Sequence, residues 1–438
     1  MPGQEHVPTQ SPAAEAATPD GPDAGALDRP AGPGLARGSG PQPGRSLLSL
    51  TDRPAVAALI ATLAAVAFVL ARWQTWAHGN ISRFIMVGRH FATPAQLPPG
   101  IPLSPIYGYD GQFFYRLALD PANLSRTAYG ITMDRSYRYM RIGYPALTWL
   151  VSLGQHSLIP VALVAVNIAG VGAIAYFGAV FARQSGRPAL AGLLLAGYFG
   201  LITSLSRDTA EPLAAACLLA GLLAIRARRQ VLAAVLLAFG ALTRETVMVA
   251  VAALAIVRVV GMVRGRHGPG RDDLPWVVPS AVFVAWQVVV KAATGSIPLL
   301  ADGGRNAGAP FIAPLSALKT ALAHLDVHRF DQYDLWLLEV AILALLSVTA
   351  LTALRSTSAP VHERLAFVLY LVEICVVTPS TWSSLDADLR SFIEVYLLAL
   401  IILLGTPRRS IWNRLLPWLG AVMVPALIVV TQHRLTGS

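Results

Sequence analysis

Charged residues are scarce in this sequence. Of its 438 residues, 13% are aspartate, glutamate, lysine or arginine, while 55% are hydrophobic. A chain of this length has room for two or three soluble domains, but so apolar a composition excludes them. Apolar segments of roughly 20 residues, the length that crosses a bilayer, recur from Ala55 to Val430. The composition therefore predicts a polytopic membrane protein.

Other common features are also missing, and each absence removes a class of protein. The apolar segments lack the strict alternation of a transmembrane barrel, so they predict helices. The two cysteines, Cys217 and Cys375, lie in apolar segments without CxxC spacing, which predicts neither a disulfide nor a metal cluster. The sequence contains no P-loop, GxSxG or HExxH motif. It also has no internal repeat, which disfavours a transporter built from inverted halves.

The formal net charge of the chain is +10, a value that would suggest nucleic-acid binding in a soluble protein. In a membrane protein the excess of arginines on cytoplasmic loops explains it, so we expect no nucleic-acid partner. Residues 1–45 are rich in proline, glycine and alanine and are predicted to form a disordered cytoplasmic tail. They do not resemble a signal peptide, because the apolar run starts near Pro54 and no small-residue cleavage site follows it.

The hydropathy pattern predicts an all-α transmembrane domain over residues 54–431 with about 11 spans. Arginines at alternate ends place the N-terminus inside and the C-terminus outside, in the cell membrane. The predicted spans are Ala55–Trp73, Leu158–Phe181, Ala189–Leu205, Pro212–Ile225, the two limbs of 231–260, Leu274–Lys291, Leu335–Leu354, Leu365–Thr378, Ser391–Leu404 and Ile411–Val430.

The segment from Val231 to Val260 is unusual because basic clusters flank it on both sides, at Arg226–Arg229 and Arg264–Arg271. Both ends are therefore expected to be cytoplasmic. The segment must go out and come back, with Thr243–Thr246 at its tip. Each limb is too short to cross a full bilayer unless the bilayer thins or the hairpin leans against other protein.

Two long loops are predicted on the outer face, at residues 75–143 and 292–334. The first mixes aromatic residues and arginines with scattered apolar ones, which predicts short helices along the membrane interface; Pro121 is expected to end one of them. In the second, apolar residues recur near helical spacing between Pro314 and Asp331 and predict an amphipathic helix. These residues are Leu315, Leu318, Leu322, Leu325 and Phe330.

The stretch Gly108–Arg116 in the first loop carries the clearest chemical signal. Asp110 is followed by Gly111, which frees the backbone, and aromatic neighbours offer flat apolar faces. A carboxylate displayed in this way at a membrane surface suits a general base, whereas the alternative is that Asp-Gly simply forms a turn. The candidate substrate contacts beside Asp110 are Tyr109, Gln112, Tyr115 and Arg116.

Polar groups in or beside a membrane are costly and often functional. Asp208 and Glu211 form a second outer cluster at the start of a predicted span. Helix capping is the alternative for them, because acidic residues and Pro212 suit a first turn. Arg244 and Glu245 form a third cluster at the hairpin tip. Either these two charges neutralise one another, or Arg244 binds a phosphate through its planar guanidinium.

Arg390 precedes the tenth predicted span and is a further phosphate candidate, with an ordinary interfacial arginine as the alternative. His324 and His328 are four residues apart, with Asp331 three residues further on, and could share a helix face as metal ligands. A solvated polar face explains them equally well. We therefore expect no cofactor, and a divalent metal stays an unsupported alternative.

A first span followed by a large outer loop with an acidic residue, interfacial helices and many further spans resembles the GT-C superfamily of integral-membrane glycosyltransferases. The sequence Tyr109–Tyr115 is similar to a Tyr-Asp-Gly-Gln-Phe-Tyr-Tyr signature of bacterial membrane proteins related to that superfamily. Asp208-x-x-Glu211-Pro212 and Leu242–Thr246 also look like motifs of this group. The resemblance extends over nearly the whole apolar part of the chain.

The resemblance implies transfer of a sugar from a polyprenyl-phosphate donor to a lipid or glycan acceptor of the cell envelope, with inversion, on the outer face. Asp110 would be the base for the acceptor hydroxyl. Arg244, Arg390 or a loop arginine would offset charge on the leaving phosphate. A transporter or flippase of a lipid-linked or amphipathic substrate is the rival, and a structural partner of an envelope complex is a third alternative.

Overall fold

The apolar runs of the sequence form helices in the structure, a computed structural model that describes residues 52–104, 107–266, 268–301, 308–325, 331–382 and 389–436. The described residues belong to one unit, Ser46–Ser438. The predicted tail at residues 1–45 lies outside the described residues, as do His328 and Phe330.

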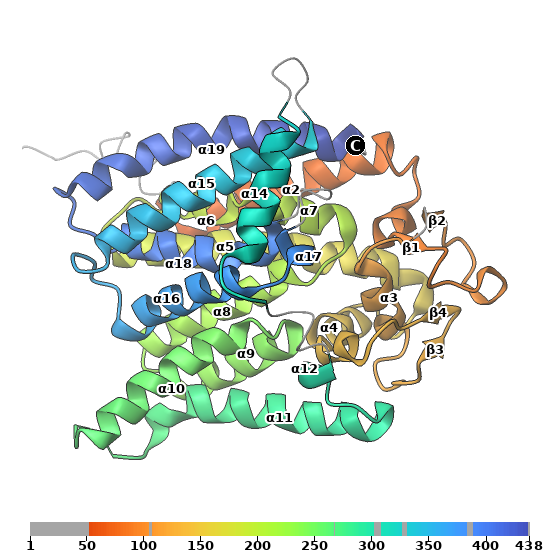
Figure 1. Ribbon diagram of the computed structural model, residues 1–438, viewed down its shortest axis with the longest axis horizontal. Coiled ribbons are helices and arrows are strands. Elements are labelled where there is room, and N and C mark those ends of the chain that lie inside the picture. Colours follow the sequence, from red (N-terminus) through yellow and green to blue (C-terminus); the bar gives the residue numbers. More distant parts are fainter. Residues whose placement is uncertain are drawn as a thin grey trace, which may run out of the picture. The chain divides into compact units, whose positions relative to one another are not determined.

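Within the described residues, five helices are long and apolar enough to cross a membrane. They are α2 (Pro54–Thr75), α5 (Ile159–Gln184), α11 (Leu274–Thr294), α15 (Gln332–Ala353) and α19 (Ile411–Thr436). Each lies where the hydropathy pattern predicts a span. A proline stands in the first turn of α2, α5 and α11, where its missing N–H breaks no helical hydrogen bond. The chain is thus a mostly helical protein with several helices of membrane-spanning length (Figure 1).

The predicted span Ala189–Leu205 is not one continuous helix. The structure divides it into η5 (Ala189–Gly192), α6 (Leu193–Ala196) and α7 (Phe199–Arg207). The two halves meet at an angle of 58°. Gly192 packs so closely on α5 that a Cβ there would lie 2.1 Å from the backbone nitrogen of Ala179, and the helix stops at Gly197. Counted as one bent span, this pair brings the candidate membrane helices of the described chain to six.

Three shorter helices pack among the long ones. They are α8 (Glu211–Arg226), α16 (Val361–Val376) and α18 (Ile393–Leu404). Every residue of α18 is buried, and this helix packs against α15 and α16. Most of α8 is buried too, between α5 and α9 (Gln230–Thr243). The predictions of apolar segments at these positions are confirmed as helices, although each helix is shorter than those that meet the membrane-spanning length.

The hairpin predicted between two basic clusters is present. α9 is followed by a turn at Arg244–Thr246 and then by α10 (Val247–Val263). At 1.5 Å per residue the two limbs are roughly 21 and 26 Å long, less than a bilayer core of about 30 Å. Neighbouring helices support both limbs, since α9 packs on α8 and α11 while α10 packs on α16.

The first long loop contains short helices, as predicted, and also strands that the sequence did not predict. Its helices are η1 (Ile81–Ile85), η2 (Pro94–Gln96), α3 (Gly111–Leu119) and η3 (Ser136–Met140), and α4 (Gly143–Val151) follows it. β1 (Val87–Gly88) pairs with β2 (Leu103–Ser104) in parallel, and β3 (Thr127–Ala128) pairs with β4 (Ile131–Thr132) antiparallel. α3 ends two residues before Pro121. In Figure 1 the four strands lie around α3, close to α4, on which α3 packs.

The amphipathic helix predicted at Pro314–Asp331 is shorter than expected, because α14 covers only Ile312–Ala323. Leu315 and Leu322 are exposed on it, whereas Leu318 packs against the core. The remaining short elements are η4 (His156–Leu158), η6 (Arg271–Asp273), α12 (Pro298–Ala301), α17 (Pro379–Trp382) and η8 (Leu389–Phe392).

Candidate active site

Asp110 is the residue immediately before α3, and its backbone is held from two sides. A Cβ at Gly111 would lie 2.6 Å from the carbonyl oxygen of Arg207 and 2.8 Å from that of Ile85, so only glycine fits between them. Gln112 ties the same turn to the loop, since its Oε1 accepts from the Gly88 amide at 3.0 Å. The carboxylate of Asp110 is therefore presented from a fixed backbone.

Two arginines bind the Asp110 carboxylate, one on each oxygen. Arg138 Nη1 lies 2.6 Å from Oδ1, and Arg390 Nη2 lies 2.6 Å from Oδ2. Burial by itself would raise the pKa of Asp110, but the charges of Arg138 and Arg390 outweigh burial and hold this pKa well below its usual range. Asp110 is an ionised carboxylate at neutral pH, and in this arrangement it is a weak base.

Arg390 continues the chain of charges inward. Its Nη1 lies 2.5 Å from Glu211 Oε1, and the same oxygen lies 3.8 Å from Arg244 Nε. Arg244 then donates to both oxygens of Glu394 at 3.1 and 3.2 Å. The charges alternate in sign from Asp110 to Glu394, and the network joins the first loop, α8, the hairpin tip and α18.

Tyr109 lies beside the same arginines. The guanidinium of Arg207 lies 4.2 Å from the centre of its ring and that of Arg390 lies 5.1 Å from it. The Tyr109 hydroxyl accepts from Arg390 Nε at 3.1 Å. The aromatic face and the hydroxyl therefore fix the direction of Arg390, which is the arginine shared by Asp110 and Glu211.

A second branch binds the hairpin tip to the loop. Arg141 donates to the two oxygens of Glu245 at 2.8 and 2.6 Å, and the Tyr137 hydroxyl donates to the same carboxylate. Glu245 therefore pairs with Arg141, while Arg244 pairs with Glu394 and Glu211. The two tip charges do not simply neutralise each other, as one alternative proposed, but reach opposite sides of the site.

The network becomes more buried from one end to the other. The side-chain exposure is 22% at Arg138 and 19% at Asp110, falls to 9% at Arg390, and is 2% at Glu394. Asp110 and Arg138 thus form the more exposed end of the network. Glu211 and Glu394 form the buried end, where they fix the inner arginines.

The structure does not bring every candidate into this network. Gln112 binds backbone groups of the loop, and Tyr115 is packed in a separate apolar cluster. Arg116 is fully buried and donates to the carbonyl oxygens of Asn123 and Ser125 at 2.5 and 2.6 Å. These three side chains hold the loop together in the structure, and their expected contact with a substrate stays a prediction.

Asp208 and Glu211 behave differently, although they were predicted as one cluster. Asp208 is buried at the left-handed end of α7, with φ 48°, and its carboxylate oxygens have no hydrogen-bond partner among the described residues. Glu211 opens α8, but its carboxylate binds Arg390 and the Ser204 hydroxyl. The alternative of a capping role therefore does not describe the contacts of Glu211, and Asp208 lies outside the charge network.

Sequence reasoning missed several members of the site. Arg138, Arg141 and Tyr137 belong to the predicted outer loop 75–143, where aromatic residues and arginines predict only interfacial helices, and Glu394 lies inside a predicted span. Glu394 had a usable signal, because an acidic residue inside an apolar run is costly unless it has a partner. For Arg138 the sequence offers only Asp134, four residues earlier and 3.0 Å away in the structure. Its contact with Asp110, and that of Arg141 with Glu245, join separate elements and could not be predicted.

An anion can bind at this site by displacing a carboxylate from one of the arginines. Four arginines and five carboxylates meet in it, since Asp134 also binds Arg138 at 3.0 Å, and each guanidinium fork that holds a carboxylate also fits a phosphate. No group of three or more histidine, cysteine, aspartate or glutamate side chains within the described residues is placed to hold a metal ion. His324 stacks on Tyr333 with ring centres 4.4 Å apart. Cys217 and Cys375 are both free.

No protein-family model matches the chain, and a search of curated proteins finds no match.

Proposed function

We propose that the protein is a membrane glycosyltransferase of the GT-C type, with about 11 segments crossing or entering the cell membrane and a cytoplasmic N-terminus. It would transfer a sugar, with inversion, from a polyprenyl-phosphate donor to a cell-envelope acceptor on the outer face. The observation that carries the proposal is the Asp110 carboxylate held between Arg138 and Arg390 at the accessible end of a buried charge network. The carboxylate that we propose as the base therefore lies next to the two arginines that we propose for the phosphate.

The ion pairs of Asp110 suggest how donor binding by the arginines is coupled to proton acceptance by Asp110. A carboxylate with a strongly lowered pKa accepts protons poorly. When the donor phosphate enters, it competes with Asp110 for Arg138 and Arg390. Asp110 loses its cationic partners, and its pKa rises because the remaining burial favours the neutral form. Donor binding therefore activates the base.

The chemical step follows from this exchange. The released Asp110 takes the proton of the acceptor hydroxyl as the acceptor oxygen bonds to the anomeric carbon of the sugar. The bond from that carbon to the phosphate oxygen breaks, and its electron pair stays on the polyprenyl phosphate. Arg390 stabilises the charge on the leaving oxygen, and Glu211 with Tyr109 keeps Arg390 in position.

A transporter or flippase of a lipid-linked or amphipathic substrate remains the alternative, and one observation favours it. α6 and α7 form a broken helix pair with a 58° bend, and interrupted helices frame substrate sites in many transporters. In that case the same arginines would bind the phosphate without any proton transfer. Product formation separates the two functions.

The test compares wild type with Asp110→Asn in the full-length protein, purified in lipid nanodiscs and supplied with a panel of polyprenyl-phosphate sugars. Asparagine keeps the size of the side chain but cannot accept a proton at neutral pH. Turnover should fall by roughly two to four orders of magnitude, while donor binding is retained or strengthened because a competing charge is gone.

Asp120→Asn is the matched control, because it makes the same change at the opposite end of α3 and should leave turnover within about twofold, as expected away from the chemistry. Equal turnover in wild type and Asp110→Asn would remove Asp110 from catalysis. Transport of a lipid-linked sugar without any glycosidic product would support the alternative function instead.

A further inference from the structure

A cavity of about 380 Å³ lies between the ends of α8, α9, α10, α11 and α16 that point away from Asp110. α8 begins at Glu211 and ends at Arg226, so at 1.5 Å per residue the cavity is roughly 22 Å along the helix from the charge network. It is lined by Ile225, Arg226, Arg228, Gln230, Leu254, Val257, Arg258, Asp272, Pro275, Trp276, Pro360 and His362. This is a separate site, at the end that the topology predicts to be cytoplasmic.

Positive charge exceeds negative charge around this cavity. An adjoining cavity shares Arg228, Gln230 and Asp272 with it. Together they are lined by five arginines: Arg226, Arg228, Arg229, Arg258 and Arg271. Three carboxylates oppose them, because Asp272 lies in the cavity, Asp273 binds Arg258 and Glu363 binds Arg226. Five against three leaves an excess of two positive charges, which favours an anion.

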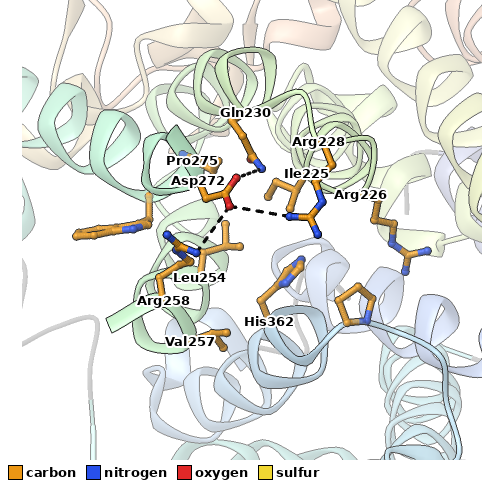
Figure 2. Close-up of a pocket in the computed structure, with 12 residues that line it drawn as sticks. Ile225, Arg226, Arg228, Gln230, Leu254, Val257, Arg258, Asp272, Pro275 and His362 are labelled. Carbon is orange, nitrogen blue, oxygen red and sulfur yellow. Dashed lines mark hydrogen bonds and ion pairs between the residues drawn. The ribbon is translucent and has the colours of Figure 1, made fainter. Parts of the chain in front are cut away.

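Asp272 occupies the centre of the cavity (Figure 2). Its carboxylate accepts from Gln230 at 2.7 Å and lies 3.9 Å from Arg228 and 3.8 Å from Arg258. These pairs are long and partly exposed, with 46% exposure at Asp272 and 82% at Arg228, so they contribute little and exchange easily. A phosphate bound at the position of this carboxylate would accept from the same groups, Gln230, Arg228 and Arg258.

His362 places a further polar atom at the same place. Its ring points toward the middle of the cavity in Figure 2, and its Nε2 is buried without a hydrogen-bond partner among the described residues. Buried polar atoms normally have a partner. A ligand that brings oxygen atoms into the cavity would provide one.

An apolar surface begins at the edge of the arginines. Val231 and Leu232 line the adjoining cavity, and with Val235 they form an outward face of α9 with 63%, 45% and 59% of their surfaces exposed. Inside the first cavity, Leu254, Val257 and Trp276 add apolar walls. A free phosphate gains nothing from an apolar surface, whereas the acyl chains of a lipid pack against it.

We propose that this cavity binds the phosphate of an anionic phospholipid headgroup, with the acyl chains along the exposed face of α9. Basic pockets between membrane helices on the cytoplasmic side bind such headgroups because the arginines meet a fixed negative charge there. The site is independent of Asp110 and of the chemistry proposed for it.

The test uses delipidated full-length protein in detergent, titrated with phosphatidylglycerol or with phosphatidylcholine of the same chains and followed by native mass spectrometry. Inorganic phosphate serves as the soluble competitor. Phosphatidylglycerol should bind about tenfold more tightly than phosphatidylcholine, as expected when a few basic residues meet an anionic headgroup. Equal binding of the two lipids, or binding that inorganic phosphate abolishes, would overturn the proposal.

Two pairs of substitutions localise the effect. Arg228→Gln with Arg271→Gln removes two exposed arginines of the cavities and should weaken phosphatidylglycerol binding on the order of tenfold. Arg264→Gln with Arg266→Gln makes the same change in charge on exposed arginines outside the cavities and should leave it within about twofold, since that charge is screened. Equal losses in both pairs would mean a diffuse charge effect and contradict the site.

Asp272→Asn provides a test of opposite sign that does not depend on losing arginines. It removes the carboxylate that competes for Arg228 and Arg258 but keeps an acceptor for Gln230. Phosphatidylglycerol should therefore bind several-fold more tightly, because one opposing charge is gone. Weaker binding in this variant would show that Asp272 serves to build the cavity and that no anion replaces it.

Discussion

Two arginines on one carboxyl group determine how Asp110 responds to pH. Each oxygen of Asp110 has its own guanidinium, from Arg138 in the same loop and from Arg390 in η8. An ionised carboxylate is needed to hold both, and protonation would release them. The stability of the loop against the helices therefore depends on the charge of Asp110.

The pH dependence has a definite sign. The pKa of Asp110 is lower in the folded protein than in the unfolded chain, so Asp110 contributes stability above its unfolded value of about 4. That contribution is lost as the pH falls from about 4 through the lowered folded value. Wild type should melt higher than Asp110→Asn at pH 7, and the gap should begin to narrow below about pH 4.

Thermal melting of the two proteins in one detergent, from pH 7 to about pH 3, measures this gap around the ordinary carboxyl pKa. Asp120→Asn again serves as the control for a substitution elsewhere on α3. A gap that stays constant over the whole range would show that Asp110 stabilises the fold through its shape and not through its charge.

At the level of elements, the network is what fastens the hairpin to the bundle. Arg244 leaves the tip between α9 and α10 and binds Glu394 in the fully buried α18. Thr246 donates to the same carboxylate at 2.5 Å, and Tyr370 of α16 donates to the Thr246 carbonyl at 2.8 Å. A hairpin too short to span the membrane alone is thereby anchored by polar contacts to its neighbours.

Glu394→Gln should therefore be strongly destabilising. It leaves Arg244, which is 3% exposed, with less compensation of its charge, and breaking one partner of a buried pair costs about 3–5 kcal/mol. Arg244→Gln should cost a similar amount. The double variant should lose less than the sum of the two, by up to about 3 kcal/mol, because no unpaired charge remains.

Melting temperatures of wild type, both single variants and the double variant complete this cycle. Additive losses would mean that Arg244 and Glu394 stabilise the protein independently, and the interpretation of the network as one unit would be wrong.

The elements also show what the sequence could reveal. Apolar length and flanking arginines correctly predicted α2, α5, α11, α15 and the α9–α10 hairpin, because hydrophobicity is a local property. The break between α6 and α7 was not predicted, since it depends on the close approach of Gly192 to α5. The partners of Asp110 were not predicted either: Arg390 is 280 residues away, and only the folded chain brings it there.

At the level of the whole molecule, the two sites described lie at opposite ends of α8. The charge network is at the Glu211 end and the arginine cavity is at the Arg226 end. If the helices cross a membrane, one site faces outward and the other inward. The basic clusters at Arg226–Arg229 and Arg264–Arg271 decide the direction, because arginines are retained on the cytoplasmic side.

We therefore expect Thr127 to be outside the cell and Arg266 to be inside it. Both side chains are exposed, so single cysteines placed there can react with a maleimide that does not cross membranes. The background is Cys375→Ser, which removes the partly exposed native thiol, whereas Cys217 is buried. Thr127→Cys should be labelled in intact cells, and Arg266→Cys should be labelled only after lysis, because the bilayer separates the two positions.

Labelling of Arg266→Cys in intact cells together with protection of Thr127→Cys would invert the topology. It would place Asp110 in the cytoplasm and rule out transfer to an acceptor on the outer face. Labelling of both in intact cells would mean that α8 does not separate the two sites across the membrane, and the assignment of a cytoplasmic lipid headgroup to the arginine cavity would fail with it.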